Sequence, residues 1–248
     1  MHHVGLFRSG LVCARWHTAS GTGALGGPLL HDIKIDEGLL IPAGRHTLTP
    51  DQVGQRQREL LLRAMVSCTS ERDFSDTTIA DVVRVARTSR SAFYEHFADK
   101  QECFLAAYEQ MTAAFIEASL QAAAGASGWQ AKLDAGILTY FRFMAEHPEV
   151  AISTVVEIHS AGRRALEARS RALREWMRTI EGLLVLARRE GVQLPHLDQV
   201  ACAAIVLAAE AYVHDYARRG RIKRVGDRAP AVQALARALF EHGVASPR

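Results

Sequence analysis

The sequence lacks the features that would tie it to a membrane, a metal or a polyanion. It contains no run of 18 uncharged apolar residues, which argues against a membrane-spanning helix. Its four cysteines are scattered without a Cys-x-x-Cys pair, so neither a zinc site nor a disulfide scaffold is indicated, and a reducing cytoplasm fits best. The 30 basic and 27 acidic residues nearly balance, so net charge alone does not indicate a nucleic-acid partner.

Signatures of enzymes and cofactor sites are also missing. No Glu-x-x-His pair, His-Glu-x-x-His motif or nucleophile elbow occurs. Residues 21–26 spell Gly-x-Gly-x-x-Gly, but glycine and proline follow where a helix would have to open. Glu210 and His214 lie one helical turn apart without further ligands, and a salt-bridged helix face is the simpler interpretation. We therefore expect no catalytic residue, no metal and no cofactor.

What is present begins with a glycine-rich leader. Eight of the 18 glycines fall within the first 45 residues, where no helical period persists. We expect residues 1–47 to be flexible. Arg45 and His46 stand just ahead of the first helix, where a basic arm could reach an adjacent minor groove.

Beyond the leader the sequence has the periodicity of α-helices, and no segment alternates like a strand. Thr49 is expected to cap a first helix of about 20 residues, and Thr78 with Asp81 has the spacing of a capping box for a short second helix. Ser89 and Asp99 are N-cap candidates for a short third helix and a long fourth one. The sequence also predicts helices near 100–123, 129–146, 148–159, 163–190, 197–218 and 230–242. The fold class is therefore predicted to be all-α.

The strongest functional signal lies between Ser75 and Lys100. This segment holds a helix, a turn of three or four residues and a short second helix with small and polar residues outward, which is typical of a helix-turn-helix. Ser89, Ser91 and Ala92 would keep the second helix narrow enough for a major groove about 12 Å wide. The guanidinium of Arg90 would then reach guanine edges or a phosphate.

The same segment resembles the DNA-binding domain of the tetracycline-repressor (TetR) family. The family pattern, Thr-Thr-x-x-x-Ile/Val-Ala-x-x-Ala-Gly-Val-Ser-x-x-x-Phe/Tyr-Tyr-x-His-Phe-x-x-Lys, is matched in register at Thr77, Thr78, Ala86, Ser89, Phe93, Tyr94, His96, Phe97 and Lys100. The resemblance implies a homodimer that reads double-stranded operator DNA through an N-terminal helix-turn-helix domain, here 48–99. A fourth helix would connect it to a larger domain, here 100–248, that binds an effector and dimerises.

The resemblance also assigns roles within the motif. Phosphate contacts, which set register on DNA, are expected from Thr77 or Thr78, Tyr94, His96 and Lys100. Base contacts, which set sequence, are expected from Thr88, Arg90, Ser91 and Ala92.

Local sequence features qualify these roles. At the turn, Arg87 stands where the family usually has glycine and Thr88 where it usually has valine. If the turn needs a positive φ, the backbone of Arg87 is strained by about 1 kcal/mol. Alternatively, the additional guanidinium adds a phosphate contact. Over residues 50–108 eight basic residues meet nine acidic ones, so affinity must rest on a local basic stripe. That stripe comprises Arg84, Arg87, Arg90, His96 and Lys100. Alternatively, Arg84 is a solvated side chain and His96 only a helix-end residue.

The C-terminal half fits a dimerisation and effector domain. Residues 200–213 are apolar on more than one face, and Ala201, Ala204 and Ala208 would allow close helix approach. Together with a helix at 231–240 they would form the four-helix interface that the resemblance implies. A two-fold dimer places two recognition helices about 34–36 Å apart and predicts an inverted-repeat operator.

A pocket for an apolar or amphipathic effector is expected among the central helices, where aromatic and polar groups mix. Its candidate residues, each of which also fits a plain core position, are Tyr140, Phe141, Met144, His159, Trp176 and Tyr212. A basic run at 218–224 reads most simply as a solvated loop, with an acidic or nucleic-acid partner as the alternative.

Taken together, the sequence predicts a cytoplasmic, ligand-responsive transcriptional repressor that is not an enzyme and binds no membrane. The competing classes are a helical enzyme or small-molecule-binding protein, and a helical scaffold that does not bind DNA. A scaffold would leave the outward Tyr94, His96 and Lys100 unexplained.

Overall fold

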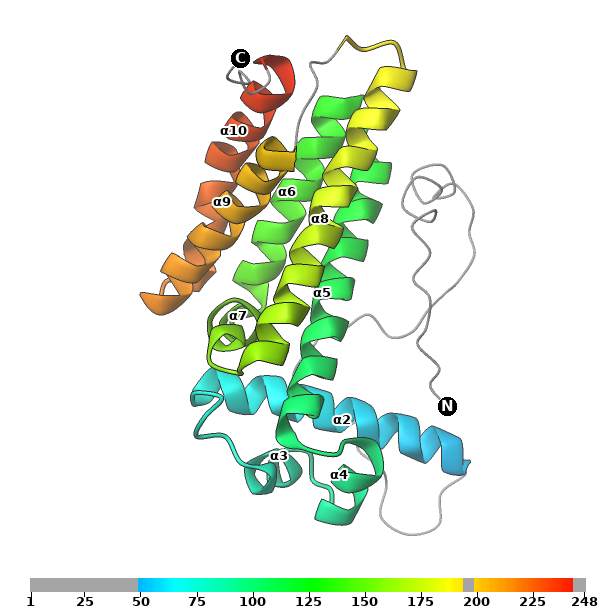
Figure 1. Ribbon diagram of the computed structural model, residues 1–248, viewed down its shortest axis with the longest axis vertical. Coiled ribbons are helices and arrows are strands. Elements are labelled where there is room, and N and C mark those ends of the chain that lie inside the picture. The colour runs from blue at the N-terminus through cyan, green and yellow to red at the C-terminus, as the bar shows by residue number, and fades with distance from the viewer. Residues whose placement is uncertain (1–48, 194–198, 243–248) are drawn as a thin grey trace.

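The computed structural model describes residues 49–193 and 199–242, and the regular elements in these ranges are all helical (Figure 1). The predicted all-α class is therefore confirmed. The leader at 1–47, with its glycine motif and the basic pair Arg45 and His46, lies outside the described residues.

Three helices form the N-terminal end of the molecule. They are α2 (Pro50–Glu71), α3 (Ile79–Val85) and α4 (Arg90–His96). Each begins where the sequence predicts a cap: Thr49 forms a capping box with Gln52, Thr78 forms one with Asp81, and the Ser89 hydroxyl accepts from the amide of Ala92 at 3.1 Å. These caps satisfy backbone donors that the first turn leaves unpaired.

Longer helices build the body above this end (Figure 1). They are α5 (Lys100–Ala124), α6 (Trp129–Glu146), α8 (Arg163–Arg189), α9 (Gln199–Arg218) and α10 (Ala229–His242), with a 3₁₀ segment η4 (Ile222–Arg228) before α10. The bounds of these helices agree with the sequence-based ones to within two residues. At 25 residues α5 is about 37 Å long, so it runs from the N-terminal end deep into the body.

The segment 148–159, predicted as one helix, is irregular instead. It consists of a short α-helix α7 (Pro148–Ala151), a π-helical turn η2 (Ile152–Val156) and a 3₁₀ turn η3 (Glu157–His159). Four of the five η2 residues are β-branched and favour a regular helix less. The Thr154 hydroxyl donates to the carbonyl of Val150 at 2.8 Å.

Two hydrophobic cores lie along the long axis, and the lower one crosses the domain boundary expected at residue 99. Around α2, α3 and α4 the lower core includes Phe93 and Phe97, but also Phe104 of α5 and Val150 and Ile158 of the α7–η3 segment. The upper core lies among α6, α8, α9 and α10. The N-terminal end, made of α2, α3 and α4, is thus packed directly on the segment that follows α6.

Helix α9 qualifies one sequence-based exclusion. By length and composition it is apolar enough to cross a membrane, the one such helix in the described ranges. Its apolarity has another explanation, because one face, including Ile205, Ala209 and Val213, is buried in the upper core.

Candidate DNA-binding site and ligand cavity

Helix α4 presents polar side chains outward from an aromatic base. Phe93 is fully buried and its ring meets that of Tyr94 edge-on at 5.6 Å, whereas Tyr94 itself is 51% exposed. Arg90 and Ser91 are also exposed, and Arg90 Nη2 donates to the Tyr94 hydroxyl at 3.5 Å. A guanidinium and a phenol are therefore paired on the surface of a narrow helix, free to turn to DNA.

One predicted base contact in α4 is wrong. Ala92 is only 6% exposed, so it cannot face bases. The reason is helical phase, because a residue two positions from Arg90 points about 200° away around the axis. Thr88, in the turn before α4, is half-buried, and its role stays a prediction.

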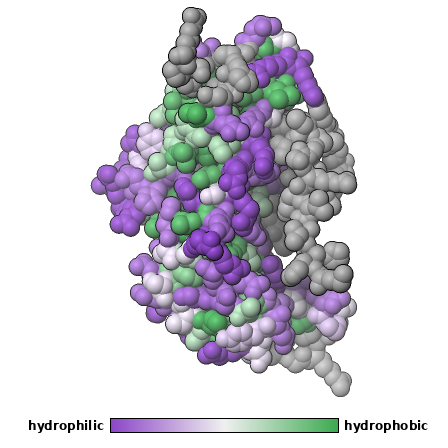
Figure 2. All heavy atoms as spheres, viewed as in Figure 1, coloured by the Kyte–Doolittle hydropathy of each residue, from purple (hydrophilic) through white to green (hydrophobic). Residues whose placement is uncertain are grey.

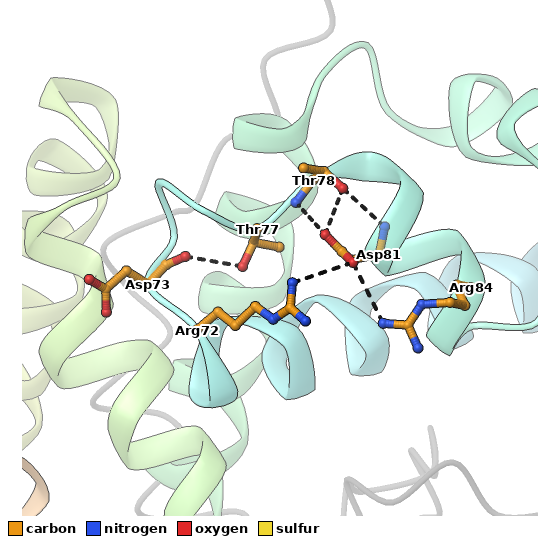
Figure 3. Close-up of polar contacts among 6 residues, drawn as sticks. All are labelled: Arg72, Asp73, Thr77, Thr78, Asp81 and Arg84. Atoms are coloured by element: carbon orange, nitrogen blue, oxygen red, sulfur yellow. Dashed lines mark hydrogen bonds and ion pairs between the residues drawn. The ribbon is translucent and has the colours of Figure 1, made fainter.

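The two threonines ahead of α3 have different surroundings (Figure 3). Thr77 is buried and its hydroxyl donates to the carbonyl of Asp73 at 3.2 Å, so it is not available to phosphate. Thr78 is exposed, and its hydroxyl donates to Asp81 at 2.6 Å while accepting from the Asp81 amide. Of the pair, Thr78 keeps the predicted phosphate role.

Asp81 organises the charges at the start of α3 (Figure 3). Hydrogen bonds from Thr78 hold the pKa of Asp81 below its usual value, with help from Arg72. The guanidinium groups of Arg72 and Arg84 lie 3.8 Å and 3.6 Å from its carboxylate. Arg84 thus contributes to the basic stripe while partly neutralised by Asp81.

The turn between α3 and α4 has the backbone strain that the sequence predicts. Arg87 adopts φ 51°, the one positive φ of a non-glycine residue in the described ranges. The amide of Thr88 reaches back to the carbonyl of Val83 at 3.0 Å, which is the bond of a left-handed helix end. The Arg87 side chain is exposed beside α4.

Replacing Arg87 with glycine is expected to affect stability and binding in opposite directions. Glycine relieves the left-handed strain, and the free energy of unfolding should rise by up to about 1 kcal/mol, less the entropy that glycine adds to the unfolded chain. Operator affinity should fall and its salt dependence should flatten by about one counterion per subunit. Urea denaturation and salt-titrated DNA binding check the two halves; Arg87→Lys, which keeps the charge, should preserve the salt dependence. A destabilised glycine variant would contradict the strain.

Lys100 holds the loop between α2 and α3. Its ammonium donates to the carbonyls of Phe74 at 2.7 Å and Ser75 at 3.2 Å, and it lies 4.4 Å from the centre of the Phe74 ring. Burial lowers the pKa of Lys100. In this structure Lys100 orders the loop that leads to Thr78, and its phosphate contact stays a prediction.

His96 packs against α2 rather than standing free. Its ring carbon Cε1 lies 3.8 Å from the position that a Cβ on Gly54 would take, and its Nε2 is buried without a hydrogen-bond partner among the described residues. Burial and, to a lesser extent, the Arg58 charge lower its pKa, opposed by Glu95. Its phosphate contact also stays a prediction.

His96 predicts a pH dependence of stability. Because its pKa is lower folded than unfolded, the unfolded chain binds the proton more readily, so its contribution is complete above about pH 6.5 and is lost below that pH. Urea denaturation at pH 7.5 and 5.5 should show a smaller loss of stability for His96→Gln than for wild type. His242→Gln, at the exposed end of α10, should behave like wild type. Equal losses in all three proteins would refute this role of His96.

Two hydrogen bonds join the η2–η3 segment to the N-terminal end. The buried Glu157 carboxylate accepts from the amide of Phe74 at 2.8 Å and from the Ser160 hydroxyl at 2.9 Å. The Thr69 hydroxyl of α2 donates to Ser153 Oγ at 3.0 Å. The same Phe74 loop is therefore held by Lys100 on one side and Glu157 on the other.

A cavity lies on the other side of the η2 turn. This Tyr140 cavity has about 320 Å³ of empty space, including its mouth. Three predicted effector residues line it, namely Tyr140, Met144 and Trp176. Thr154 and Val155 of η2 line it as well, so one turn touches both the cavity and, through Ser153, the helix α2 of the N-terminal end.

The other three predicted effector residues do not line the Tyr140 cavity. Phe141 is fully buried elsewhere in the upper core, because it is rotated about 100° around α6 from Tyr140. His159 is exposed, with its ring 6.1 Å from that of His214, and Tyr212 packs half-buried against the upper core.

The Tyr140 cavity also contains polar groups that the sequence did not place in an effector pocket. Tyr108, Thr112 and Glu210 line it, and Glu210 forms a two-bond ion pair with Arg169 of α8, with Arg169 Nε 3.0 Å from Glu210 Oε1. Burial, reinforced by Glu210, raises the pKa of Tyr140. One signal in the sequence could have indicated the buried roles of Glu210 and Glu157. Each is a charged residue inside a mainly apolar run, Glu210 in α9 and Glu157 in residues 150–158.

The outer faces of α9 and α10 carry apolar side chains, some of them visible as green among purple in Figure 2. On α9 these are Val200, Ala204, Leu207 and Ala211, at the spacing of one helical stripe. On α10 they are Ala231, Ala234, Leu235 and Ala238. Val200 is 64% and Leu207 47% exposed, so the two helices offer a surface of small and aliphatic groups beside the buried core.

The sequence matches one protein-family model, and the fold is similar to several solved structures. Residues 61–107 match the family model described as bacterial regulatory proteins, tetR family. The fatty acid degradation regulator FadR from Bacillus halodurans is similar with a TM-score of 0.68 and 15% identity, covering 82% of this chain and 100% of its own. FadR from Bacillus subtilis, solved in complex with stearoyl-CoA, has a TM-score of 0.65 and 17% identity, covering 75% and 98%.

A third solved structure, a TetR-like transcriptional regulator from Rhodococcus sp. RHA1, has a TM-score of 0.56 and 20% identity, covering 77% of this chain and 97% of its own. No curated protein matches the sequence at a significant level. At these identities the structural likeness establishes a shared fold, and the family match is confined to residues 61–107 at the N-terminal end.

Proposed function

We propose that the chain is, through its N-terminal domain, a member of the TetR family of bacterial regulatory proteins, and that it is a ligand-responsive repressor that binds operator DNA as a homodimer. The observation that carries the proposal is the outer surface of α4, where Arg90, Ser91 and Tyr94 stand exposed on a helix anchored by buried Phe93. Helices of this width fit a major groove, and an arginine there can pair with guanine.

The outer faces of α9 and α10 support the dimer. A surface built of alanines and leucines on two adjacent helices can pack against its own copy as a four-helix bundle. Two-fold symmetry would then present two α4 helices to one side of a duplex. Half-sites one helical turn apart, about 34–36 Å, form the inverted repeat that we expect as operator.

The η2–η3 segment supports ligand control. A ligand in the Tyr140 cavity would touch Thr154 and Val155, and the neighbouring Ser153 and Glu157 hold α2 and the Phe74 loop. A ligand that prefers one position of this segment would shift the N-terminal end, which carries α4, together with the segment. The connector α5 would move as well, because Lys100 at its start bonds the Phe74 loop. Release from DNA then needs no chemical step by the protein.

The ligand is proposed to be apolar or amphipathic, and the protein to act in the cytoplasm. The Tyr140 cavity mixes aromatic walls with hydroxyl groups, and Arg169 neutralises Glu210, its one lining carboxylate. The structure of the Bacillus subtilis relative holds stearoyl-CoA, an amphipathic molecule, which supports the same class here.

A gel-shift series on the DNA upstream of the protein's own gene tests the proposal. Full-length protein should retard one fragment at low salt, and unlabelled competitor DNA of random sequence should not displace it at equal concentration. Failure to bind any upstream fragment at low salt would overturn the regulatory function.

Removing the Glu157 carboxylate is expected to loosen the contact between the η2–η3 segment and the Phe74 loop of the N-terminal end. In Glu157→Ala the buried amide of Phe74 loses its acceptor, so the free energy of unfolding should fall by about 1–3 kcal/mol. Hydrogen exchange of the Phe74 amide should accelerate more than global unfolding explains. Glu157→Gln, which keeps an acceptor oxygen, should lose less.

The control for this prediction is Glu146→Ala. Glu146 is an exposed glutamate of α6 that pairs with Arg142 in the same helix, so its loss should change the free energy of unfolding by less than about 0.5 kcal/mol. If Glu157→Ala and Glu146→Ala are indistinguishable in stability and in Phe74 exchange, Glu157 does not hold the loop.

A further inference from the structure

A second cavity lies among α5, α6, α8 and α9, with about 470 Å³ of empty space including its mouth. We propose that this Ser119 cavity binds a small, uncharged and mainly apolar molecule carrying one carbonyl or hydroxyl oxygen, which pairs with Ser119. The proposal rests on the proposed function in that such a molecule would serve as a second effector beside the ligand of the Tyr140 cavity. Of the predicted effector residues, Trp176 alone lines it.

Ser119 is the observation that points to a ligand. It is 7% exposed, lines the cavity, and its hydroxyl oxygen is buried without a hydrogen-bond partner in the described part of the chain. Thr112, two turns earlier on α5, shows the usual solution, because its hydroxyl donates to the carbonyl of Tyr108 at 2.9 Å. Buried polar groups are nearly always paired, and a ligand oxygen in the cavity would supply the missing partner.

The remaining walls define the rest of the ligand. They are aliphatic over most of their extent, from Leu120, Leu133, Ile137, Ile180, Leu183 and Ile205. Lys132 is the one ionisable side chain that lines this cavity, and its ammonium donates to the carbonyls of Ala123 and Ala126 at the end of α5. Two of the three ammonium protons are thus taken by backbone carbonyls, and the aliphatic walls, which cannot solvate an ion, favour an uncharged molecule.

Trp176 separates the Ser119 cavity from the Tyr140 cavity, because it lines both. Its ring lies 4.4 Å from that of Tyr140 and 5.6 Å from that of Phe115. Filling the Ser119 cavity changes the surroundings of this indole directly. Its fluorescence therefore reports occupancy of either cavity, and the signal should disappear in Trp176→Phe. Variants at Ser119 and Gly136, which line the Ser119 cavity alone, assign the signal to that cavity.

Binding of four eight-carbon probes to the full-length protein, free of DNA, tests the site. By calorimetry and Trp176 fluorescence, 2-octanone and 1-octanol should bind more tightly than octane, and all three more tightly than octanoate. Ser119→Ala should weaken 2-octanone and 1-octanol about three- to tenfold and leave octane unchanged, since it removes one hydrogen bond. Its melting temperature should not fall, because the hydroxyl it removes has no protein partner.

Gly136→Ala is the matched variant. A Cβ at Gly136 would lie 3.7 Å from the Ser119 carbonyl oxygen, an ordinary contact, and it would reduce the cavity without touching the hydroxyl. It should weaken all three uncharged probes alike. The proposal is overturned if octanoate binds best, if no uncharged probe binds, or if Ser119→Ala weakens octane as much as 2-octanone.

Failure of this proposal and failure of the proposed function are distinguishable. Probe binding without release of operator DNA in a gel shift would support the Ser119 cavity as a binding site and contradict its role as the effector site. DNA binding without binding of any uncharged probe would overturn the Ser119 proposal and leave the DNA-binding function intact.

Discussion

Replacing Leu207 with glutamate is expected to separate the dimer into monomers and to abolish tight operator binding. Leu207 is 47% exposed on the outer face of α9, so a monomer can tolerate the change. In a two-fold interface the substitution occurs twice, and burying each leucine is worth about 1.5–3 kcal/mol. The dimer should therefore weaken by about 10²- to 10⁴-fold, which sedimentation velocity at micromolar concentration measures.

Leu166→Glu is the control for this change. Leu166 is a similarly exposed leucine, but it lies on α8 and away from the apolar faces of α9 and α10. It should remain a dimer with wild-type affinity for DNA. A dimeric Leu207→Glu protein, or a wild-type protein that is monomeric at micromolar concentration, would contradict the four-helix interface.

Replacing Arg90 with alanine is expected to weaken operator binding and to relax its sequence preference. A guanidinium on the exposed face of α4 can pair with guanine, and losing such a pair costs about 1–3 kcal/mol per half-site. Binding to the operator and to variants substituted at each position, measured by fluorescence anisotropy, should show the preference flattened at one base pair in each half-site. The change should not affect folding, because Arg90 is exposed.

Tyr94→Phe separates base reading from phosphate contact on the same helix. The variant keeps the aromatic ring that packs on Phe93 and removes a hydroxyl that Arg90 contacts in the free protein. We expect a uniform loss of about 0.5–1.5 kcal/mol across operator variants. Arg178→Ala, on the exposed side of α8, should bind like wild type. A uniform loss for Arg90→Ala as well would show that Arg90 reads no base.

The elements whose signals are local could be predicted from the sequence. Thr49, Thr78, Ser89 and Asp99 cap four helices because a side-chain oxygen at that position meets an amide two or three residues on. The positive φ of Arg87 lies where the TetR-family pattern has glycine, the residue that adopts this conformation most easily. The all-α class and the helix-turn-helix rest on such signals.

Features that depend on packing across the fold could not be predicted. Whether Ala92 or Ser91 faces outward depends on the rotation of α4 over the lower core, which the short helix does not reveal. The π turn at η2 serves contacts on both its sides, with Thr69 of α2 and with the Tyr140 cavity. No spacing in the sequence shows that Glu157 meets the backbone of Phe74, 83 residues earlier.

The candidate effector residues show the same limit. Aromatic residues in apolar helices are found both in cores and in pockets, and composition does not distinguish the two. Tyr140 and Met144, one helical turn apart on α6, line the cavity together, whereas His159 sits in an irregular turn that faces solvent. A cavity is defined by residues from four or five elements at once, so a single stretch of sequence predicts it poorly.

The most direct measurement is a hydroxyl-radical footprint of the full-length protein on the upstream DNA fragment that it binds. A dimer that presents two α4 helices to one duplex should protect two half-sites on one side of it, related by an inverted repeat and centred about one helical turn apart, with both protections lost together in Leu207→Glu. A single protected site, two sites in direct repeat, or protection that survives unchanged in Leu207→Glu would contradict the paired presentation of α4.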